Sequence, residues 1–478
     1  MEYEKFLEQN KDEMIFALQQ AVRVNSEEGE SFMGEKGRIY PFGQGVQQSL
    51  ELVLKMGRDL GFEAKNVDNY GGHIDFLGTG DKIMGILGHL DVVPAGNDWS
   101  HNPYGGEIID GKLYGRGTTD DKGPVISCLY AMKALKDAGY VPNATIRLIL
   151  GLDEETNWKG IEHYFSKEKR PDYGFTPDGE FPLINGEKGL LVFNLAKKFA
   201  NTTVEGLSLR SLKGGIAPNS VADSARAVVN SPKSEQYEEI KEKIAAYRSL
   251  TGHKINCKGV GKSLEITTTG VAAHGAKPEK GLNAISVMMD FLGGLNFVNE
   301  DLNDFIGFYN KHIGFCTNGD SLGIGLKDEP SGELTLNVGM VEFTKGAGKL
   351  VINVRYPVTF SDKDVYEPLD PILTRYNIGL IKEMHKVPVY IDRNNPMVKT
   401  LLDIYRKHTG DTESEPLVIG GGTYAKATPG ILAFGALFPG DEDLMHQKDE
   451  CIDLDRFMQM TKIYAEAIYK LSSEEYND

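Results

Sequence analysis

The sequence predicts an α/β catalytic domain, in which a mixed, largely parallel sheet is flanked by helices, together with an inserted α+β lid domain. Two observations support this fold class. Strand-like and helix-like patterns alternate between residues 83 and 190, and short β-like stretches replace that alternation from about 190 to 390. A chain of 478 residues is also too long to fold around a single hydrophobic core, so we expect more than one domain. We expect the catalytic domain to comprise 1–188 and 390–478, and the lid domain to comprise 189–389.

The alternation in the first segment follows from the spacing of apolar residues. Residues 83–87 form a short apolar run, and 145–150 form another. Between them, apolar residues over 123–138 recur in steps of three and four, which is typical of one face of a helix. Pro124 suits its first turn and Gly139 suits its C-terminal stop. A strand, a helix and a strand in succession predict a parallel sheet.

The remaining elements are predicted from shorter patterns. In the insertion we expect strands at 190–195, 263–269, 333–343 and 349–358 and a helix at 234–247. After the insertion we expect a helix at 397–408, a strand at 431–437 and a closing helix at 454–471. No repeat or long flexible linker is visible, so short connections should join the two domains.

Composition excludes several classes of partner. The formal net charge of −17 repels nucleic-acid phosphates and anionic lipid, so we expect neither nucleic acid nor a membrane as partner. The first residues show no secretory signal pattern, and no apolar run is long enough to span a membrane. Four scattered cysteines without a CxxC pair fit a reducing cytoplasm, where we expect the protein to reside.

Polar clusters follow three of the predicted strands. They are His89-Leu90-Asp91, Asp153-Glu154-Glu155 and Thr176-Pro177-Asp178. Open α/β sheets place ligand sites at the carboxyl ends of their strands, so the three clusters together indicate a site. Side chains two apart on an extended chain point the same way, so Asp91 can sit behind His89 and improve it as a metal ligand. The alternative for this cluster alone is a loop histidine with a capping aspartate.

Two acidic segments have structural alternatives as well. Asp120 and Asp121 lie in a glycine-rich stretch before the helix predicted at 123–138, where an N-cap with first-turn acids would need only one carboxylate. Glu154 and Glu155 could belong to a plain acidic turn. In a metal site, a cation would hold one of them ionised, and carboxylate neighbours would raise the pKa of the other, as a general base requires.

His446 stands alone far downstream, in Met445-His446-Gln447-Lys448-Asp449-Glu450. It completes a series: GHLDVVP, GRGTTDDKGP, DEET, TPDGEFP and MHQKDE occur in this order. The series resembles the metallopeptidase family of aminoacylases, glutamate carboxypeptidases and bacterial dipeptidases. The long insertion and GGTYAK at 421–426 most resemble the PepV-type bacterial dipeptidases.

The resemblance implies a site with two divalent metal ions. His89 and Asp178 would bind one ion, Glu155 and His446 the other, and Asp120 would bridge both. Glu154 matches the general base and Asp91 the partner behind His89. A cis peptide between Asp120 and Asp121 is also implied. Imidazole and carboxylate ligands without thiolates suit zinc, and manganese or cobalt could occupy the same set.

The resemblance extends into the insertion. His274 matches a histidine that polarises the scissile carbonyl; because the same chain supplies it, we expect a monomer. Asn219 and Arg355 match substrate-clamping positions, with Arg355 suited to a C-terminal carboxylate. The backbone of Gly421, Gly422 and Thr423 would complete that grip. The alternatives are a turn residue for Asn219 and an edge-strand ion pair for Arg355.

The predicted function is metal-dependent hydrolysis of unblocked dipeptides, with a small peptide as substrate. Two other reactions of the same family remain alternatives: deacylation of N-acyl amino acids and carboxypeptidase action on longer peptides. A non-catalytic metal-binding or peptide-binding protein on the same scaffold is an alternative of a different class. A serine or cysteine hydrolase has little support, because no GxSxG elbow stands out.

Overall fold

The structure is a computed structural model that describes residues 2–34 and 37–473, and it divides into two compact units. The first unit comprises Met1–Gly186, Ile391–Val418 and Gly422–Asp478, and the inserted unit comprises Glu187–Tyr390 and Ile419–Gly421. The short return of 419–421 to the inserted unit differs from the expected boundaries. Two hydrogen bonds explain it: Lys188 N donates to Ile419 O at 2.9 Å, and Arg355 Nη1 donates to Gly420 O at 2.7 Å.

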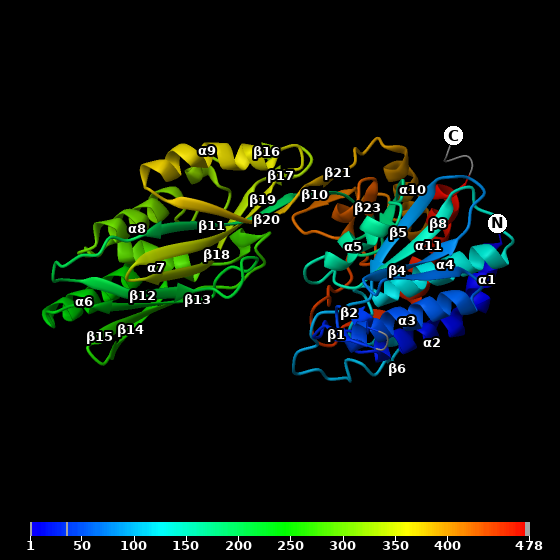
Figure 1. Cartoon of the computed structure of the whole chain (residues 1–478), viewed down its shortest axis with the longest axis horizontal. Helices are drawn as coiled ribbons and strands as arrows, with labels where there is room; N and C mark the ends of the chain where they lie inside the picture. Colours follow the sequence, from blue (N-terminus) through cyan, green and yellow to red (C-terminus); the bar gives the residue numbers. More distant parts are fainter. Residues whose placement is uncertain (1, 35–36, 474–478) are drawn as a thin grey trace. The chain divides into compact units, whose positions relative to one another are not determined.

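The first unit is built on a mixed sheet whose central strands are parallel, as the sequence predicts. The strands lie in the order β10-β23-β9-β5-β8-β4-β3 (Figure 1). The pairs β23–β9, β9–β5 and β5–β8 are parallel, whereas β10, β4 and β3 pair antiparallel with their neighbours. The bounds are β3 Glu63–Val67, β4 Gly71–Phe76, β5 Ile83–His89, β8 Thr145–Gly151, β9 Tyr173–Thr176, β10 Ile184–Glu187 and β23 Ile431–Ala433.

Helices cover both faces of this sheet because successive residues of its strands alternate between two apolar clusters. On one face Ile86 and Leu148 join the main core with α4 (Lys122–Asp137) and α11 (Leu454–Leu471). On the other face Leu87 and Ile149 pack with residues of α5 (Lys159–Lys167) and η4 (Tyr424–Ala427). The remaining helices of the unit are α1 Tyr3–Gln9, α2 Lys11–Arg23, α3 Gln44–Asp59 and α10 Pro396–Thr409. The predicted helices at 123–138, 397–408 and 454–471 are confirmed.

One predicted strand is shorter than expected. The apolar run 431–437 predicts a strand over its whole length, but β23 ends at Ala433. Gly435 has φ +83, which takes the chain out of the extended region. The run is apolar because its phenylalanine packs into the core: the rings of Phe434 and Phe181 lie 5.2 Å apart, edge to face.

Smaller elements complete the first unit and its boundaries. β6 (Glu107–Ile109), β7 (Lys112–Tyr114) and β24 (Cys451–Asp453) form a three-stranded antiparallel sheet. β1 (Phe32–Met33) and β2 (Ile39–Tyr40) form a two-stranded antiparallel pair. β21 (Val389–Tyr390) and β22 (Leu417–Ile419) lie where the chain passes between the units.

The inserted unit is an antiparallel sheet packed against helices, which agrees with the predicted α+β class. The sheet has the order β14-β15-β13-β12-β18-β19-β11-β20, and its apolar face forms one core with α6 to α9 (Figure 1). The strands are β11 Gly189–Lys198, β12 Ser208–Gly214, β13 Ser224–Asn230, β14 Lys254–Val260, β15 Ser263–Thr269, β18 Thr335–Thr344, β19 Ala347–Tyr356 and β20 Gly379–Lys386. The helices are α6 Glu235–Thr251, α7 Ala284–Gly293, α8 Glu300–His312 and α9 Asp362–Arg375, with short pieces η2 Pro278–Lys280, η3 Asp320–Leu322, β16 Lys327–Asp328 and β17 Gly332–Glu333.

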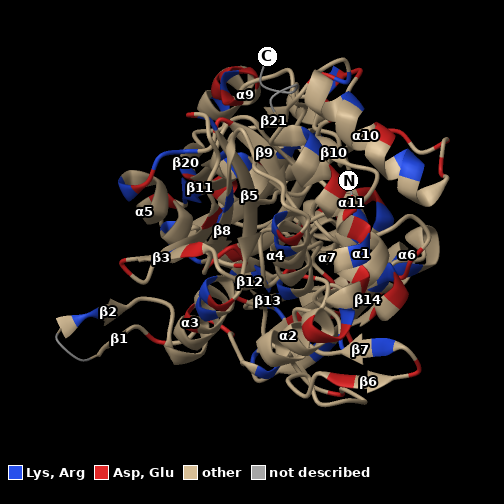
Figure 2. Ribbon diagram, turned by 90° about the vertical axis from the view of Figure 1, so that its right-hand side faces the viewer, with Lys and Arg blue, Asp and Glu red and all other residues tan. Residues whose placement is uncertain are grey.

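Charged residues of both signs are interspersed on the helices. Figure 2 shows both acidic and basic residues on α6 and on α10. Among the described residues, no helix is both long enough and apolar enough to cross a membrane.

Candidate metal centre

The three polar clusters meet at one edge of the central sheet. β5 ends at His89, and it lies between β8, which ends at Gly151, and β9, which ends at Thr176. Because all three strands are parallel, their carboxyl ends share an edge. The strands therefore deliver His89, Glu154 and Asp178 to one place, as the sequence predicts.

His89 directs one ring nitrogen at the acidic residues. Its Nδ1 lies 3.0 Å from the main-chain oxygen of Asp91. A carbonyl oxygen can only accept, so Nδ1 carries a proton, which leaves Nε2 to face the carboxylates. Burial lowers the pKa of His89, but hydrogen bonds to Asp120 and Asp91 outweigh it and raise that pKa well above its ordinary value. The carboxylate of Asp91 lies farther from Nδ1, at 3.4 Å, and its other oxygen accepts from Glu155 N at 3.1 Å. Asp91 thus lies behind His89 as predicted, but its backbone carbonyl lies nearer to His89 Nδ1 than its carboxylate does.

Asp120 is shared between the two histidines. Its Oδ1 lies 2.9 Å from His89 Nε2, and its Oδ2 lies 2.9 Å from His446 Nε2. His446 Nε2 also lies 3.0 Å from Glu155 Oε1. One carboxylate whose two oxygens face two imidazoles has the geometry of a ligand that bridges two cations.

Asp178 and Glu154 complete the cluster on the side of His89. Asp178 Oδ2 lies 3.9 Å from His89 Nε2. Ligand atoms of His89, Glu154 and Asp178 all lie within 4.8 Å of one another, and so do those of His89, Asp120 and Glu155. The predicted metal ligands, the predicted base Glu154 and Asp91 therefore converge.

The acidic groups perturb one another strongly. Burial raises the pKa of Glu154 well above its ordinary value, and the neighbouring charge of Asp178 raises it further. Burial and Asp120 likewise raise the pKa of Glu155. Hydrogen bonds to Asp120 and Glu155 raise the pKa of His446 to about 11. Carboxylates that are buried together in this way fit a site built for cations.

The loop before α4 has the backbone that the resemblance implies, since the peptide bond between Asp120 and Asp121 is cis. Asp121 makes no side-chain capping bond to α4, so the simple N-cap interpretation is wrong. Its Oδ2 instead accepts from His89 N at 3.1 Å. Lys122 is buried and donates to Ala21 O and Val24 O, which ties the start of α4 to the end of α2.

Glu450 is a site residue that the sequence interpretation missed. It is fully buried, and its Oε1 accepts from the backbone N–H groups of Gly117, Thr119 and Asp120 at 3.1, 2.9 and 3.3 Å. Its Oε2 lies 2.7 Å from Arg116 Nη1. Glu450 thus fixes the loop that carries Asp120, and it lies only four residues after His446. The only feature of the sequence that could have pointed to Glu450 is its position at the end of the MHQKDE motif, which also contains His446.

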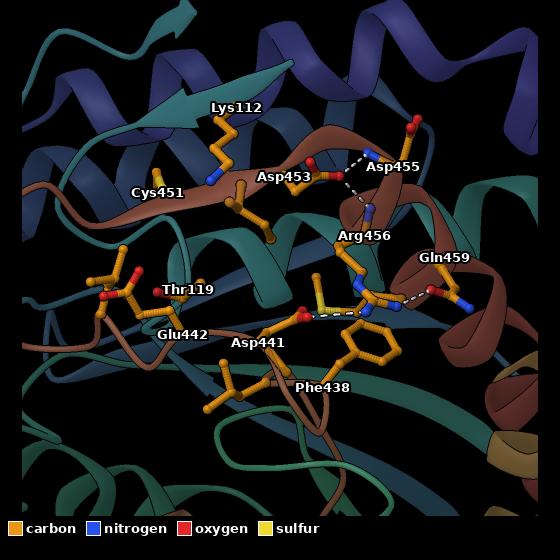
Figure 3. A pocket seen from close by; sticks show the side chains of 15 residues that line it. Lys112, Thr119, Phe438, Asp441, Glu442, Cys451, Asp453, Asp455, Arg456 and Gln459 are labelled. Carbon is orange, nitrogen blue, oxygen red and sulfur yellow. Dashed lines mark hydrogen bonds and ion pairs between the residues drawn. The ribbon is translucent and has the colours of Figure 1, made fainter. Parts of the chain in front are cut away.

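The loop that leads to His446 is held in place by contacts with α11. A cavity of about 590 Å³ separates this loop from β7, β24 and the start of α11 (Figure 3). Across it, Arg456 of α11 binds Asp441 at 3.0 Å, and its guanidinium lies 4.7 Å from the ring centroid of Phe438. Asp453 caps α11 by accepting from the backbone N–H groups of Asp455 and Arg456. These contacts hold residues 438–441 against α11.

Residues 85–470 match the model of peptidase family M20/M25/M40. The chain belongs to this family. A protein of Bacillus subtilis (strain 168) named "Putative dipeptidase YtjP" is 37% identical over 99% of this chain and 100% of its own length. "Putative dipeptidase SH1171" of Staphylococcus haemolyticus (strain JCSC1435) is 38% identical over 91% of this chain and 92% of its own. The crystal structure of the M20 family metallo-carboxypeptidase Sso-CP2 from Sulfolobus solfataricus has a similar fold, with a TM-score of 0.56 at 17% identity over 96% of this chain and 98% of its own.

Two of the predicted substrate contacts of this M20 peptidase lie together in the inserted unit. An antiparallel bridge pairs Ser220 with His274, and Gly275 N donates to Asn219 O at 2.7 Å. The side chains of Asn219 and His274 are exposed. Asn219 does lie in a turn-like loop, but that loop is paired with the segment that carries His274.

Arg355 of the M20 peptidase is a buried cation. It lies on β19, between β18 and β11, so it is not on an edge strand. It donates to Asn353 Oδ1 and Gly420 O, and among the described residues no carboxylate lies within 4 Å of it. Burial lowers its pKa to about 10. The edge-strand ion pair considered from sequence is therefore wrong.

The glycine segment lies at a boundary between the units. Gly421 ends the short piece assigned to the inserted unit, and Gly422 begins the next piece of the first unit. Thr423 starts η4, where its side chain accepts from Ala425 N. The adjacent Tyr424, which the sequence interpretation did not single out, packs edge to face on His89 with ring centroids 6.3 Å apart.

Proposed function

We propose that this M20 peptidase is a dipeptidase that hydrolyses the peptide bond of unblocked dipeptides, with Glu154 as the general base. The observation that carries the proposal is the sharing of Asp120 between His89 and His446, because it supplies a place for two cations at the carboxyl edge of the sheet. PepV-type dipeptidases are the branch of the family that we propose for it.

The residues of the centre fit two divalent cations. His89 and Asp178 would hold one, Glu155 and His446 the other, and Asp120 would lie between them. Two imidazoles with carboxylates and no thiolate favour zinc, with manganese or cobalt as alternatives. Bound there, the cations would supply Lewis-acid polarisation of the substrate carbonyl and of a water molecule.

Glu154 is suited to move the proton. Its raised pKa lets the carboxylate take a proton from the attacking water and then give it to the leaving amine. The base is held beside the ligands because Trp158 Nε1 donates to Glu154 O at 2.7 Å and Asp153, one residue earlier, accepts from Gly160 N. These two contacts fix the turn on which Glu154 lies.

The inserted unit would supply the groups that recognise the substrate. Arg355 is buried beside no carboxylate of the described chain, so a substrate carboxylate would be its counter-ion. The backbone N–H groups of Gly421, Gly422 and Thr423 would also donate hydrogen bonds to that substrate carboxylate. We assign His274 to stabilising the oxyanion and Asn219 to orienting the substrate.

The assignment to dipeptides is finer than the family itself. The two bacterial relatives carry the name dipeptidase, whereas Sso-CP2 is named a carboxypeptidase. An N-acyl amino acid deacylase or a carboxypeptidase would use the same centre and would also need Arg355. We further propose that the protein works in the cytoplasm as a monomer.

The decisive experiment compares Glu154→Gln with the unmodified chain. We expect hydrolysis of an unblocked dipeptide to fall by about three orders of magnitude or more, because a positioned base contributes roughly 10² to 10⁴ and the water loses its proton acceptor. Metal stoichiometry, measured by mass spectrometry of the folded protein, should stay at two. Glu162→Gln, at an exposed position of α5, is the matched control.

Substrate length then separates the rivals. A dipeptide, the matching tripeptide and the N-acetyl amino acid are compared under identical conditions. Preference for the dipeptide supports the proposal, and preference for either of the others replaces it with carboxypeptidase or deacylase action. Failure to cleave any of them while two metals remain bound would favour the non-catalytic alternative.

A further inference from the structure

Two buried asparagines face each other across neighbouring strands of the inserted unit. Asn337 of β18 and Asn353 of β19 are register partners in an antiparallel pair, and their side chains are 2% and 1% exposed. Leu336 and Val354, next to them along the strands, belong to the apolar core that packs on the helices. The asparagines therefore lie on the opposite face of the sheet, as Arg355 does. Burying an amide is costly unless it makes hydrogen bonds, so the contacts of these two side chains show what they provide.

Asn353 holds the guanidinium of Arg355 without neutralising it. Its Oδ1 accepts from Arg355 Nε at 3.1 Å, and Gly420 O accepts from Arg355 Nη1 at 2.7 Å. Both acceptors are uncharged. An aspartate in place of Asn353 would have the same shape, but it would give the guanidinium a permanent counter-ion. A neutral acceptor instead fixes the orientation of Arg355 and leaves its charge for the carboxylate of a ligand.

Asn337 holds the loop that carries Asn219. Its Nδ2 donates to Pro218 O at 3.0 Å and to Ser220 O at 2.9 Å, the carbonyls on either side of Asn219. Carbonyl oxygens can only accept, and the side-chain amide is an uncharged group that offers two donors from one nitrogen. The Oδ1 of Asn337 receives no hydrogen bond from the described residues, so its amide serves this loop.

The same loop lies directly against β18, where the strand bulges at Gly339. A Cβ added to this glycine would lie 2.5 Å from the carbonyl oxygens of residues 217 and 218, so a larger residue would push the loop away. Beyond the loop, Ser220 pairs with His274 in an isolated antiparallel bridge. The hydrogen bonds from Asn337 therefore also bear on the segment that carries His274.

We propose that Asn353 and Asn337 are positioning residues for substrate recognition: Asn353 keeps Arg355 oriented and cationic for the substrate carboxylate, and Asn337 fixes the loop that presents Asn219. This inference rests on the proposed function, which assigns Arg355 and Asn219 to the substrate. The two asparagines have separable effects. Since Arg355 contacts only the carboxylate, a change at Asn353 should discriminate between a dipeptide and its amide, whereas a change at Asn337 should affect both substrates alike.

The test for Asn353 compares two substitutions in the full chain. Asn353→Asp keeps the acceptor but neutralises Arg355, so we expect KM for an unblocked dipeptide to rise by about tenfold or more, while kcat/KM for the dipeptide amide changes little. Asn353→Leu removes the acceptor and leaves the charge, so KM for the dipeptide should rise less than in Asn353→Asp. Asn256→Asp is the matched control, because Asn256 Oδ1 accepts from Arg248 Nη2 at 3.0 Å at an exposed position of β14.

A merely structural role for Asn353 predicts the reverse order, with Asn353→Leu the more damaging change and equal losses for the two substrates; that order would overturn the proposal. Binding separates this inference from the proposed function. In the Glu154→Gln variant, addition of Asn353→Asp should raise the Kd of the dipeptide by about tenfold or more in calorimetry and leave the Kd of the amide unchanged. Failure of the unmodified chain to hydrolyse any dipeptide would count against the proposed function alone, whereas a dipeptide Kd that Asn353→Asp does not change, or no dipeptide binding, would overturn the inference.

The test for Asn337 measures the loop directly. Asn337→Asp removes both donors, so we expect hydrogen exchange of 217–221 and 273–275 to become about tenfold faster or more, and kcat/KM to fall by a similar factor for the dipeptide and for its amide. Asn337→Ala removes the donors without adding a charge and should reproduce the faster exchange if the aspartate variant does not fold, as checked by circular dichroism. Asn256→Asp again serves as the control. Unchanged exchange in a folded Asn337 variant would overturn the assignment of this residue.

Discussion

Replacing the buried carboxylate of Glu450 by an amide should destabilise the first unit strongly. Glu450→Gln keeps an acceptor for the N–H groups of Gly117 and Thr119 but leaves the Arg116 guanidinium buried without its counter-ion. Both partners are almost completely buried, at 0% and 1% exposure, and their charged atoms lie 2.7 Å apart. Removing one partner of such a pair costs about 3 to 5 kcal/mol. We therefore expect a loss of at least about 3 kcal/mol in the free energy of unfolding.

Tryptophan fluorescence reports the unfolding of the first unit, so it can measure this loss of unfolding free energy. The chain has two tryptophans, Trp99 and Trp158, and both lie in the first unit. The Arg116 guanidinium lies 5.2 Å from the ring centroid of Trp99, so the probe is next to the altered pair. Urea titration of the metal-free protein gives the unfolding free energy of this unit without a contribution from bound metal.

Two comparisons make the result decisive. Glu442→Gln removes an exposed carboxylate from the same segment and should change the unfolding free energy by less than about 0.5 kcal/mol. The double variant Arg116→Met with Glu450→Gln should be less destabilised than the sum of the single variants, because neither charge is then left alone. A loss below about 1 kcal/mol for Glu450→Gln would refute the reasoning.

Three further outcomes are expected. Arg355→Met should lower kcat/KM for a dipeptide by about a hundredfold, because losing a buried charged contact costs roughly 2 to 5 kcal/mol. The kcat/KM for a dipeptide amide, which lacks the carboxylate, should change little. Equal losses for both substrates in steady-state assays would argue against binding of the substrate carboxylate by Arg355. His73 has a pKa lowered to about 4, chiefly by burial, so the folded state binds its proton less readily than the unfolded state, and stability should fall as pH drops from about 6.5 towards 4, by up to roughly 3 kcal/mol. His73→Gln should flatten that part of the curve in urea titrations, and an unchanged slope would contradict the assignment. Chelation should abolish peptidase activity and lower the thermal midpoint, and added zinc, manganese or cobalt should restore both; activity that survives removal of all metal, checked by elemental analysis, would exclude the proposed centre.

Much of the first unit could be predicted because its signals are local. Apolar residues spaced three and four apart predicted α4, which begins at Lys122 and ends at Asp137. Apolar runs that end in acidic residues predicted β5, β8 and the convergence of His89, Glu154 and Asp178. The apolar run that contains β23 predicted too long a strand, because hydrophobicity reports burial and Phe434 is buried in the core without belonging to a strand.

The sequence by itself determined which side chains could hold cations, since residue types and the ends of strands can be identified from local sequence patterns. Only the tertiary structure decided how they are held. Glu450 binds Arg116 across 334 positions, and Arg355 is buried on an interior strand with no described carboxylate beside it. The physical reason is that a hydrogen bond or an ion pair depends on which groups folding brings within about 3 Å, and no local pattern records a partner so distant in sequence.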